Sequence, residues 1–555
     1  MTELLVVLVL ALVVIAGATV LGPRLGIASP LVLVAVGVVA SFLPVFSSTH
    51  VEPELILEGV LPPLLYSAAV SMPAMNFRRE FGAIGGLSVI LVVGSALLLG
   101  VFFALAVPGL GFAWGVALGA ILSPTDAVAT SIIKQTPVSQ RVVAMLDGES
   151  LLNDATALVL LRTAILATAA SFSFWDAVGR FSYSVVVAVV IGGLVGVLNL
   201  VVRKRVTDPT VNTVISFTVP FLASVPTGLL GASGLVAAVV AGLVTGVRAP
   251  RDLPPQNRLS DTQNWRTVEL VLEGAVFLTM GVQIKSIVAN VEQDHGGVGT
   301  AVLVAVGALV LTIAVRAAYV APLLGFLRAR SRHGQQMQTR IQDMQERMTT
   351  PEGAQETFQE VNHRRRRVSE RDLDRFARRV TQSLANIDYF VREPLGWREG
   401  AAVVWAGMRG AVTVAAAQTL PDDTPQRSVL VLVAFTVAAL SLLVQGGTTG
   451  LLLARITPPA DPVATAGRTR AEVTRIFELL RSSSDAIPEP PQAQERTPDG
   501  FAASMSHRLA VIAVQRSALL DARDNGTFDA DVLADALANL DADQIAIEMR
   551  GTLTA

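Results

Sequence analysis

The sequence predicts an all-α polytopic membrane protein, and three observations support this fold class. Of the 555 residues, 52% are hydrophobic and only 16% are charged, with a mean hydropathy of +0.55. A soluble protein would carry roughly a quarter of its residues as Asp, Glu, Lys or Arg. Apolar segments recur along the chain, each long enough for the helix of about 20 residues that crosses a bilayer. Acidic residues lie within some of these segments, which indicates an ion or proton pathway inside the membrane.

About thirteen apolar segments are predicted to cross the membrane. They lie near residues 3–22, 27–46, 54–73, 82–107, 112–134, 149–172, 182–202, 210–228, 231–248, 267–288, 299–326, 398–419 and 427–454. The first contains Glu3 instead of a basic region, and no small-residue cleavage site in it is followed by a soluble chain. We therefore expect a retained helix there, with a cleaved signal peptide as the alternative.

Basic residues in the short loops predict the orientation, because cytoplasmic loops carry more Lys and Arg. With the N-terminus outside, twelve basic residues fall in inner loops: Arg24, Arg78, Arg79, Lys134, Arg141, Arg203, Lys204, Arg205, Arg248, Arg251, Arg258 and Arg266. Only three fall in outer loops: Arg180, Lys285 and Arg427. An outside N-terminus and an odd number of segments predict a cytoplasmic C-terminal tail. Arg greatly outnumbers Lys, which together with the many Ala, Val and Gly residues suggests a GC-rich bacterial genome.

Two polar parts accompany the transmembrane domain, which is predicted to comprise residues 1–455. Residues 327–397 form an insertion with Arg364–Arg367 at its centre, and residues 456–555 form a helical tail. Both are expected in the cytoplasm as solvated helical appendages. Binding of anionic lipid by Arg364–Arg367 is the alternative for the insertion, and a regulatory role is the alternative for the tail.

The segment near 149–172 begins with two acids, Glu149 and Asp154. A charged carboxylate at the bilayer centre costs at least ~2.5–3.5 kcal/mol, so such acids are candidates for an ion or proton pathway. In a helix, Ser150 and Asp154 share one face, and Glu149 and Asn153 share the neighbouring one. The hydroxyl and the carboxylate offer hard oxygen ligands to a small cation, and the carboxylate can take a proton instead. Competition between the two ions for Asp154 indicates an antiporter; a structural hydrogen bond between helices is the alternative.

The preceding segment is predicted to break at Ser123–Asp126. Pro124 removes a backbone donor and clashes with the previous helical turn, and unwound backbone at membrane depth is tolerated only where it is buried or lines a cavity. The freed carbonyl of Thr125 is therefore a candidate cation ligand. Asp126 would balance the helix N-terminus that the break creates. An ordinary proline kink is the alternative.

A second interruption is predicted at Gly407–Gly410, where Arg409 lies between glycines in an apolar segment. A buried Arg needs an acidic partner, and Glu149 is the expected one because Asp154 must stay available for the ion. Two discontinuous helices in the two halves of a transporter indicate inverted repeats with a site near the bilayer midplane. We therefore expect these two helices to cross there.

Glu273 and Arg316 are further charges within apolar segments. We expect them either to pair with each other or to support the site, and a structural pair is favoured over a role as ligands.

Several function classes lack the residues that they need. The sequence contains no Cys, and its five His lie outside the predicted spans: His50, His295, His333, His363 and His507. A zinc or haem site therefore has no plausible ligands, and without a P-loop the chain is not expected to use ATP. No cofactor, enzyme activity or nucleic-acid partner is expected.

Six stretches carry a family resemblance: Leu61–Leu65, Ser123–Ala127, Gly148–Asp154, Ser233–Gly234, Phe277–Gly281 and Gly407–Ala411. They are similar to the NhaP/NHE (sodium/proton exchanger) branch of the monovalent cation:proton antiporters, over about residues 1–455. The stretch Gly148–Asp154 is highly specific, whereas Leu61-Pro62-Pro63 alone would be weak. The resemblance implies exchange of Na⁺ or Li⁺ for H⁺ by alternating access, and so sodium transport and pH homeostasis at a cell membrane.

The resemblance also assigns roles to residues of the site. It implies that Asp154 binds either the cation or the proton. Ser150 would bind Na⁺ through its hydroxyl and Thr125 through its carbonyl, and Asp126 would assist, through water. Asn153 in place of an acid marks the electroneutral branch of the family, which exchanges one Na⁺ for one H⁺.

Further implications concern the architecture. Glu149 and Arg409 match the buried ion pair that holds the core helices of the family. A homodimer is implied, with a dimerisation domain and a core domain that moves.

One departure from the family pattern concerns the ion itself. Many NhaP-type proteins carry an acid shortly after Leu-Pro-Pro, where this chain has Tyr66-Ser67-Ala68. Ser67 can hydrogen-bond a water but supplies no charge, so ion affinity and Na⁺/K⁺ selectivity stay open and K⁺/H⁺ exchange is the alternative.

A cation channel would need a continuous pore lined by acids or carbonyls. A membrane enzyme would need a base, a lid or a set of metal ligands, and none accompanies Asp154.

Overall fold

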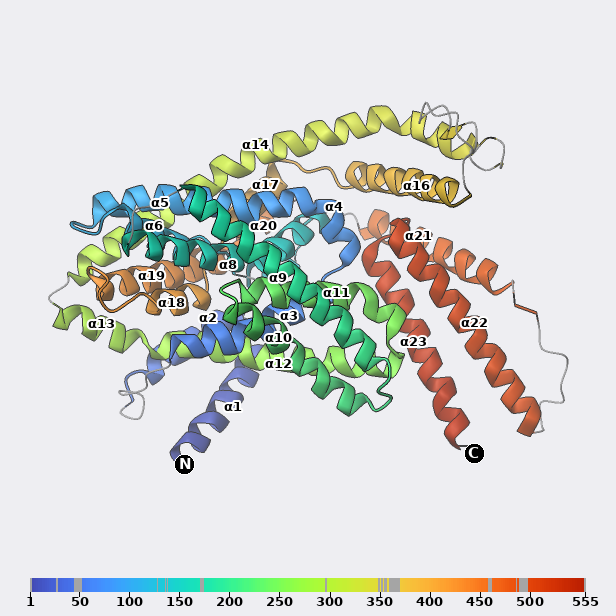
Figure 1. Ribbon diagram of the computed structural model, residues 1–555, viewed down its shortest axis with the longest axis horizontal. Helices are drawn as coiled ribbons and strands as arrows, with labels where there is room; N and C mark the ends of the chain where they lie inside the picture. The colour runs from blue at the N-terminus through green and yellow to red at the C-terminus, as the bar shows by residue number, and fades with distance from the viewer. Residues whose placement is uncertain are drawn as a thin grey trace. The chain divides into compact units, whose positions relative to one another are not determined.

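Helices account for all regular secondary structure in the part of the chain that the computed structural model describes (Figure 1). The described residues are 2–25, 28–43, 52–126, 128–134, 136, 138–169, 174–294, 297–347, 350, 353, 357–358, 370–457, 462–485, 487–488 and 498–553. The predicted all-α fold class is therefore confirmed. The Arg364–Arg367 run, for which lipid binding was the alternative, lies outside the described residues.

The chain divides into two compact units. One unit consists of Met1–Asp252, Leu259–Leu323 and Gly396–Pro458, and the other of Leu253–Arg258, Leu324–Leu395 and Pro459–Ala555. The second unit contains helices α16 (Glu370–Arg392), α21 (Pro462–Ser484), α22 (Pro498–Asn525) and α23 (Ala530–Leu553). Its tail helices bury a small apolar core of their own that includes Ile476, Leu519 and Leu533.

The first unit holds most of the helices that could cross a membrane. In the described part of the chain, nine helices are long and apolar enough to do so, and three shorter apolar helices lie at Ser29–Ala40, Leu55–Ser71 and Phe112–Leu122. Each of the thirteen predicted segments contains helix. Breaks divide some segments into pieces too short to span alone, so the number thirteen stays a prediction.

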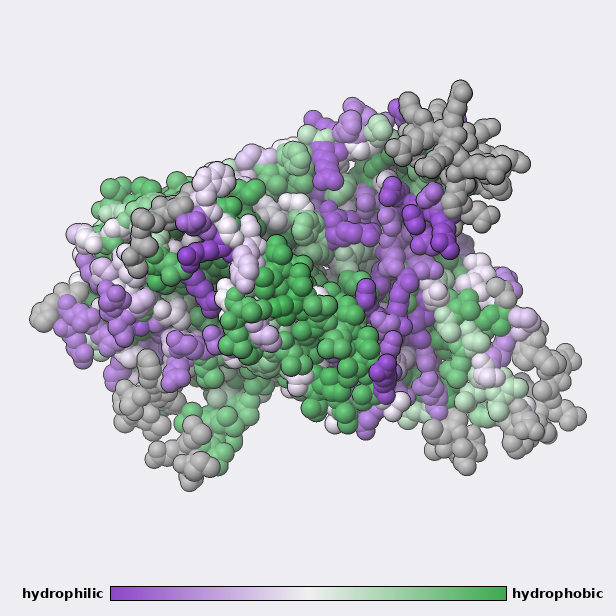
Figure 2. Space-filling view, viewed as in Figure 1, coloured by the Kyte–Doolittle hydropathy of each residue, from purple (hydrophilic) through white to green (hydrophobic). Residues whose placement is uncertain are grey.

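An apolar outer surface covers α9 (Phe174–Arg203) and α10 (Pro209–Leu229), as Figure 2 shows. Val186, Leu194 and Val214 are each more than half exposed there. A soluble monomer rarely exposes a continuous apolar surface of this kind. These side chains are therefore suited to contact lipid.

The first of two helix groups in this unit surrounds α12 and is called the panel group. It comprises α1 (Thr2–Leu25), α2 (Ser29–Ala40), a π-helical stretch (Leu55–Val60) continuing into α3 (Leu61–Ser71), α9, α10, α11 (Gly234–Asp252) and α12 (Pro255–Val282). Trp265 of α12 lies against Tyr66 of α3, with ring centroids 5.2 Å apart, and donates a 2.9 Å hydrogen bond to Ser216 of α10. Arg203 of α9 forms a 3.0 Å ion pair with Asp261 of α12. Polar and aromatic contacts therefore fix α12 within this group.

The second group contains both interrupted helices and is called the crossing group. It comprises α4 (Ala74–Gly85), a π-helical stretch (Gly86–Leu91) continuing into α5 (Val92–Ala106), α6 (Phe112–Leu122), α7 (Val128–Ile133), α8 (Gln140–Ala169), the part of α14 (Val298–Arg347) up to Leu323, α17 (Trp397–Trp405), α18 (Ala411–Gln418), α19 (Arg427–Ser441) and α20 (Gly447–Ile456). Helix α6 packs against both α5 and α8. The start of α8 is tied to α4 by a buried ion pair in which Arg141 Nε lies 2.6 Å from Glu80 Oε1.

A second buried ion pair joins α8 to α14. Arg316 Nη1 and Nη2 lie 2.5 and 2.7 Å from the two carboxylate oxygens of Glu149, and both side chains are at most 2% exposed. Arg316 Nε donates a 2.8 Å hydrogen bond to the carbonyl of Val403 in α17. One guanidinium therefore connects three helices of the crossing group.

This pair corrects two expectations from the sequence. The predicted pairing of Glu149 with Arg409 is wrong, and so is a pair between Arg316 and Glu273. The sequence showed which charges are buried, but the choice of partner depends on how α14 packs beside α8, 167 residues apart at the contact. Packing of this kind leaves no local signal in the sequence.

Substitution of the two paired residues by Gln tests this assignment. Arg316→Gln leaves the Glu149 charge buried without a partner and is expected to cost about 3–5 kcal/mol. Adding Glu149→Gln should restore most of that stability, because the uncompensated charge is removed. The measurement is the unfolding midpoint of the detergent-solubilised protein, followed by tryptophan fluorescence.

The control is the same pair of measurements with Arg409→Gln in place of Arg316→Gln. Glu149→Gln should not restore stability there, because Arg409 bonds to backbone carbonyls. Rescue of the Arg409 variant and not of the Arg316 variant would contradict the pairing.

Candidate functional site

Both predicted helix interruptions are present, and their backbones meet. Helix α6 ends at Leu122, residues 123–126 are not helical, and α7 begins at Val128. Helix α17 ends at Trp405 and α18 begins at Ala411. The Asp126 amide donates a 2.8 Å hydrogen bond to the Met408 carbonyl, which joins the two unwound stretches.

Arg409 satisfies the carbonyls that the breaks leave without helical partners. Its Nε donates a 2.8 Å hydrogen bond to the Leu122 carbonyl at the end of α6, and its guanidinium also binds the Gly407 carbonyl. The Arg409 amide donates to Ser441 Oγ at 2.9 Å. A cation at helix C-termini is favourable because these ends carry partial negative charge. Arg409 therefore holds the crossing together instead of neutralising Glu149.

The crossing is close enough to require glycine at position 410. A Cβ atom built on Gly410 would overlap the Asp126 carboxylate. The Asp126 side chain also accepts a 3.1 Å hydrogen bond from the amide of Val128, at the N-terminus of α7. This contact matches the expected balance between Asp126 and the new helix N-terminus.

A cavity of about 110 Å³ lies beside the crossing, between the panel group and the crossing group. Its lining residues are Leu61, Leu64, Leu65, Ala68, Pro124, Thr125, Asp126, Ser150, Leu151, Asp154, Glu269, Glu273, Gly410, Val412 and Thr413. The structure thus brings together four residues predicted to bind the ion: Asp154, Ser150, Thr125 and Asp126.

Asp154 is the most unusual group in this cavity. Its side chain is 8% exposed, and its carboxylate has no hydrogen bond or ion pair among the described residues. Ser150, one turn earlier in α8, donates a 3.0 Å hydrogen bond to the Asp147 carbonyl and keeps its oxygen lone pairs available. A buried carboxylate without a partner is costly. This position therefore favours a bound cation or a proton.

Thr125 and Asn153 form a hydrogen-bonded support behind the cavity. Asn153 Nδ2 donates to Thr125 Oγ1 at 2.8 Å and to the Thr125 carbonyl at 3.2 Å. Thr125 Oγ1 donates in turn to Glu149 Oε1 at 3.2 Å. The Thr125 carbonyl keeps one lone pair, because a carbonyl oxygen can accept two hydrogen bonds. Asn153 is fully buried and does not line the cavity.

Helix α12 supplies two acids to the same cavity. Glu273 was predicted as a supporting residue, whereas Glu269 was missed. Their spacing of four residues places them on one face of α12, and this was the available sequence signal. Ser67 of α3 does not line the cavity; its hydroxyl lies 3.5 Å from Glu269 Oε2.

The charges around the cavity are strongly one-sided. Among the described residues that line it, four are acids, Asp126, Asp154, Glu269 and Glu273, and none is basic. The described residues hold no cluster of three or more His, Cys, Asp or Glu side chains able to bind a metal ion. A cation here would therefore be coordinated by a mixture of carboxylate, hydroxyl, carbonyl and water oxygens.

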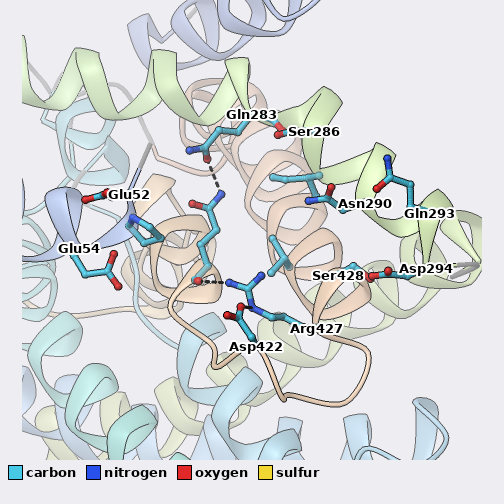
Figure 3. A pocket seen from close by; sticks show the side chains of 14 residues that line it. Glu52, Glu54, Gln283, Ser286, Asn290, Gln293, Asp294, Asp422, Arg427 and Ser428 are labelled. Carbon is cyan, nitrogen blue, oxygen red and sulfur yellow. Dashed lines mark hydrogen bonds and ion pairs between the residues drawn. The ribbon is translucent and has the colours of Figure 1, made fainter. Parts of the chain in front are cut away.

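A larger polar cavity of about 570 Å³ lies elsewhere in the first unit (Figure 3). Its lining includes Glu52, Glu54, Asp294 and Asp422, with Arg427 as its one basic residue. Figure 3 shows Arg427 beside Asp422, with Nε 3.7 Å from the nearer carboxylate oxygen. The residues predicted to bind the ion do not line this cavity, so size alone does not identify the site.

Comparisons with known proteins agree with this geometry. The family model described as sodium/hydrogen exchanger, transmembrane, matches residues 8–345 and 376–455, more than half of the chain. An uncharacterized Na⁺/H⁺ exchanger of Mycobacterium bovis is 27% identical over 578 residues, covering 98% of this chain and 96% of that protein. The low-affinity Na⁺/H⁺ antiporter NhaS1 of Synechocystis sp. is 25% identical over 521 residues, covering 91% and 85%.

A solved structure shares the fold. The sodium proton antiporter MjNhaP1 from Methanocaldococcus jannaschii superposes with a TM-score of 0.54 and 14% identity, covering 82% of this chain and 99% of that chain. The family matched above is one of transporters rather than enzymes. From its sequence match, supported by this shared fold, the chain belongs to the sodium/hydrogen exchanger family.

Proposed function

We propose that this protein exchanges Na⁺, or Li⁺, for H⁺ across the inner membrane of a bacterium by alternating access. The observation that carries the proposal is the buried Asp154 carboxylate, which has no partner among the described residues and lines a cavity at the crossing of two broken helices. One carboxylate in such a place can hold a cation or a proton, and each ion displaces the other. The name of the Synechocystis relative, a low-affinity Na⁺/H⁺ antiporter, supports the same choice of ions.

Three groups are proposed as protein ligands of Na⁺: the Asp154 carboxylate, the Ser150 hydroxyl and the Thr125 carbonyl. Oxygen ligands of this kind can replace the hydration shell of an alkali cation. Asp126 is proposed to act through water, since its carboxylate already accepts the Val128 amide. K⁺/H⁺ exchange is the second candidate, because α3 lines the cavity with apolar residues and contributes no acid.

The exchange is proposed to be electroneutral, with one cation for one proton. Asn153, which precedes Asp154, cannot titrate, and Glu149 is held by Arg316 and Thr125. Of the four described acids that line the cavity, Asp154 shares α8 with the proposed ligand Ser150, and it is proposed to carry the exchanged proton. A homodimer is proposed on the basis of the family, and regulation by the tail at residues 456–555 is proposed from its separate helical core.

The large polar cavity in Figure 3 is proposed as the external entrance for cations. Its lining residues come from the predicted outer loops and from the ends of the spans beside them, and among the described lining residues the acids outnumber the one basic residue, Arg427. An excess of negative charge in a cleft raises the local concentration of cations. This assignment depends on the predicted orientation with the N-terminus outside.

Replacement of Asp154 tests the central assignment. Asp154→Asn keeps the size of the side chain but can neither hold a cation by charge nor carry a proton. Exchange by the purified protein in vesicles, followed with a pH-sensitive dye, is expected to fall to the level of protein-free vesicles for Na⁺, Li⁺ and K⁺.

Asp147→Asn is the matched control, because Asp147 lies two turns earlier in α8, pairs with Lys134 at 3.0 Å and does not line the cavity. It should retain exchange. Transport by the Asp154 variant at the wild-type rate would place the ion site elsewhere.

A methyl group at position 410 tests the close crossing of the broken helices. Gly410→Ala is expected to displace Asp126 and to cost about 1–3 kcal/mol through overpacking. Both the unfolding midpoint and the exchange rate should fall. Gly94→Ala is the control, since nothing lies within 4 Å of a Cβ there. Equal effects of the two substitutions would show that the crossing is looser than described.

Stoichiometry can be tested with an imposed membrane potential. One-for-one exchange moves no net charge, so the rate of Na⁺-driven proton movement should not change when the potential is clamped at different values with K⁺ and valinomycin. Na⁺ and Li⁺ gradients serve for the measurement, because K⁺ sets the potential. A rate that rises severalfold with the potential would contradict electroneutral exchange.

A further inference from the structure

We propose that Glu273 is a second cation-binding carboxylate, which receives the cation between a neighbouring cavity and the site at Asp154. The inference rests on the proposed cation/proton exchange and adds a binding residue from the panel group. Glu273 belongs to α12, whereas Asp154 belongs to α8 of the crossing group.

Glu273 lines two cavities at once. One is the cavity of about 110 Å³ that contains Asp154. The other, of about 630 Å³, is lined by residues of α1, α2, α7, α12 and α20, with hydroxyl groups from Thr19, Ser29, Ser131 and Thr136. Among the described residues that line this larger cavity, Glu273 alone is charged. A cation that enters it therefore meets a single carboxylate, and the same carboxylate also borders the Asp154 cavity.

No partner among the described residues neutralises Glu273. Its side chain is half-buried, and no hydrogen bond or ion pair joins it to another described residue. Three basic groups of the crossing group are engaged with other partners: Arg316 binds Glu149, Arg409 binds carbonyls, and Lys134 binds Asp147. An intramembrane acid without a counter-charge is costly to keep and marks an ion pathway. A mobile cation is the partner that this position lacks.

The packing of α12 fixes where Glu273 can act. The next residue, Gly274, lies against α1, where an added Cβ would come within 2.7 Å of Ile15 Cγ2. The backbone beside Glu273 therefore packs closely against α1. Helix α3, on the same wall, contributes only apolar residues. Of the panel group, α12 alone can supply negative charge to the cation at this point.

Kinetics of the full-length protein in vesicles tests the proposal. Glu273→Gln removes one unit charge from a partly desolvated cation position, which corresponds to a rise in the KM for Na⁺ of about tenfold. The value of kcat should change little, because Asp154 and the helix crossing are intact. Glu273→Asp should keep a KM close to that of the wild type. Glu292→Gln, which removes an exposed acid outside both cavities, is the matched control.

A measurement on the unmodified chain covers the case in which Glu273→Gln does not fold. A hydrophobic carbodiimide labels carboxyl groups at membrane depth, and mass spectrometry of peptides reports the rate at Glu273. Na⁺ at ten times KM is expected to slow labelling at Glu273, whereas choline should not.

The outcomes separate the two proposals. Wild-type vesicles without Na⁺-, Li⁺- or K⁺-dependent proton movement would overturn the proposed exchange itself. Normal wild-type exchange with an unchanged KM in Glu273→Gln would overturn the role of Glu273 alone. Labelling of Glu273 at the same rate with Na⁺ and with choline would also overturn it.

Discussion

Backbone groups that leave a helix inside a membrane must find partners within the protein, and the arrangement of the site follows from this constraint. The two broken helices meet it by bonding to each other, amide of Asp126 to carbonyl of Met408. Arg409 binds the Leu122 carbonyl at the end of α6, where the helix dipole leaves negative charge, and the Gly407 carbonyl in the unwound stretch after α17. Because main chain and one guanidinium hold the crossing, the carboxylate of Asp154 is not needed to hold it.

The two acids of α8 differ in role because their surroundings differ. Glu149 receives two hydrogen bonds from Arg316 and one from Thr125, so its charge is compensated at a fixed position. Asp154 lies five residues later and receives none among the described residues. In a medium of low dielectric, the first arrangement is stable and rigid, and the second requires a mobile positive charge. A structural acid and a transporting acid can therefore share one helix.

Much of this could be predicted from the sequence, and the failures have a common cause. Hydropathy located the helices, Pro124 located the first break, and the glycines around Arg409 located the second. Each of these signals is local. The predicted partner of Glu149 was wrong because Arg316 and Arg409 are both buried arginines in apolar segments. Only the packing of α14 and α17 distinguishes them. Glu269 was missed because its importance depends on which face of α12 meets the cavity.

The cavity lies between two helix groups, so the charge on its acids affects how easily the groups can move past each other. Asp154 and Glu273 belong to different groups, and none of the described residues that line their shared cavity is basic. If the groups move relative to each other, as the proposed exchange requires, the crossing group carries the Asp154 carboxylate past apolar side chains of the panel group such as Leu61 and Leu65. In an empty site its charge is uncompensated, and loss of hydration opposes the movement. A bound cation or a proton removes the obstacle, so only loaded states would cross, which is the condition that makes a transporter an exchanger.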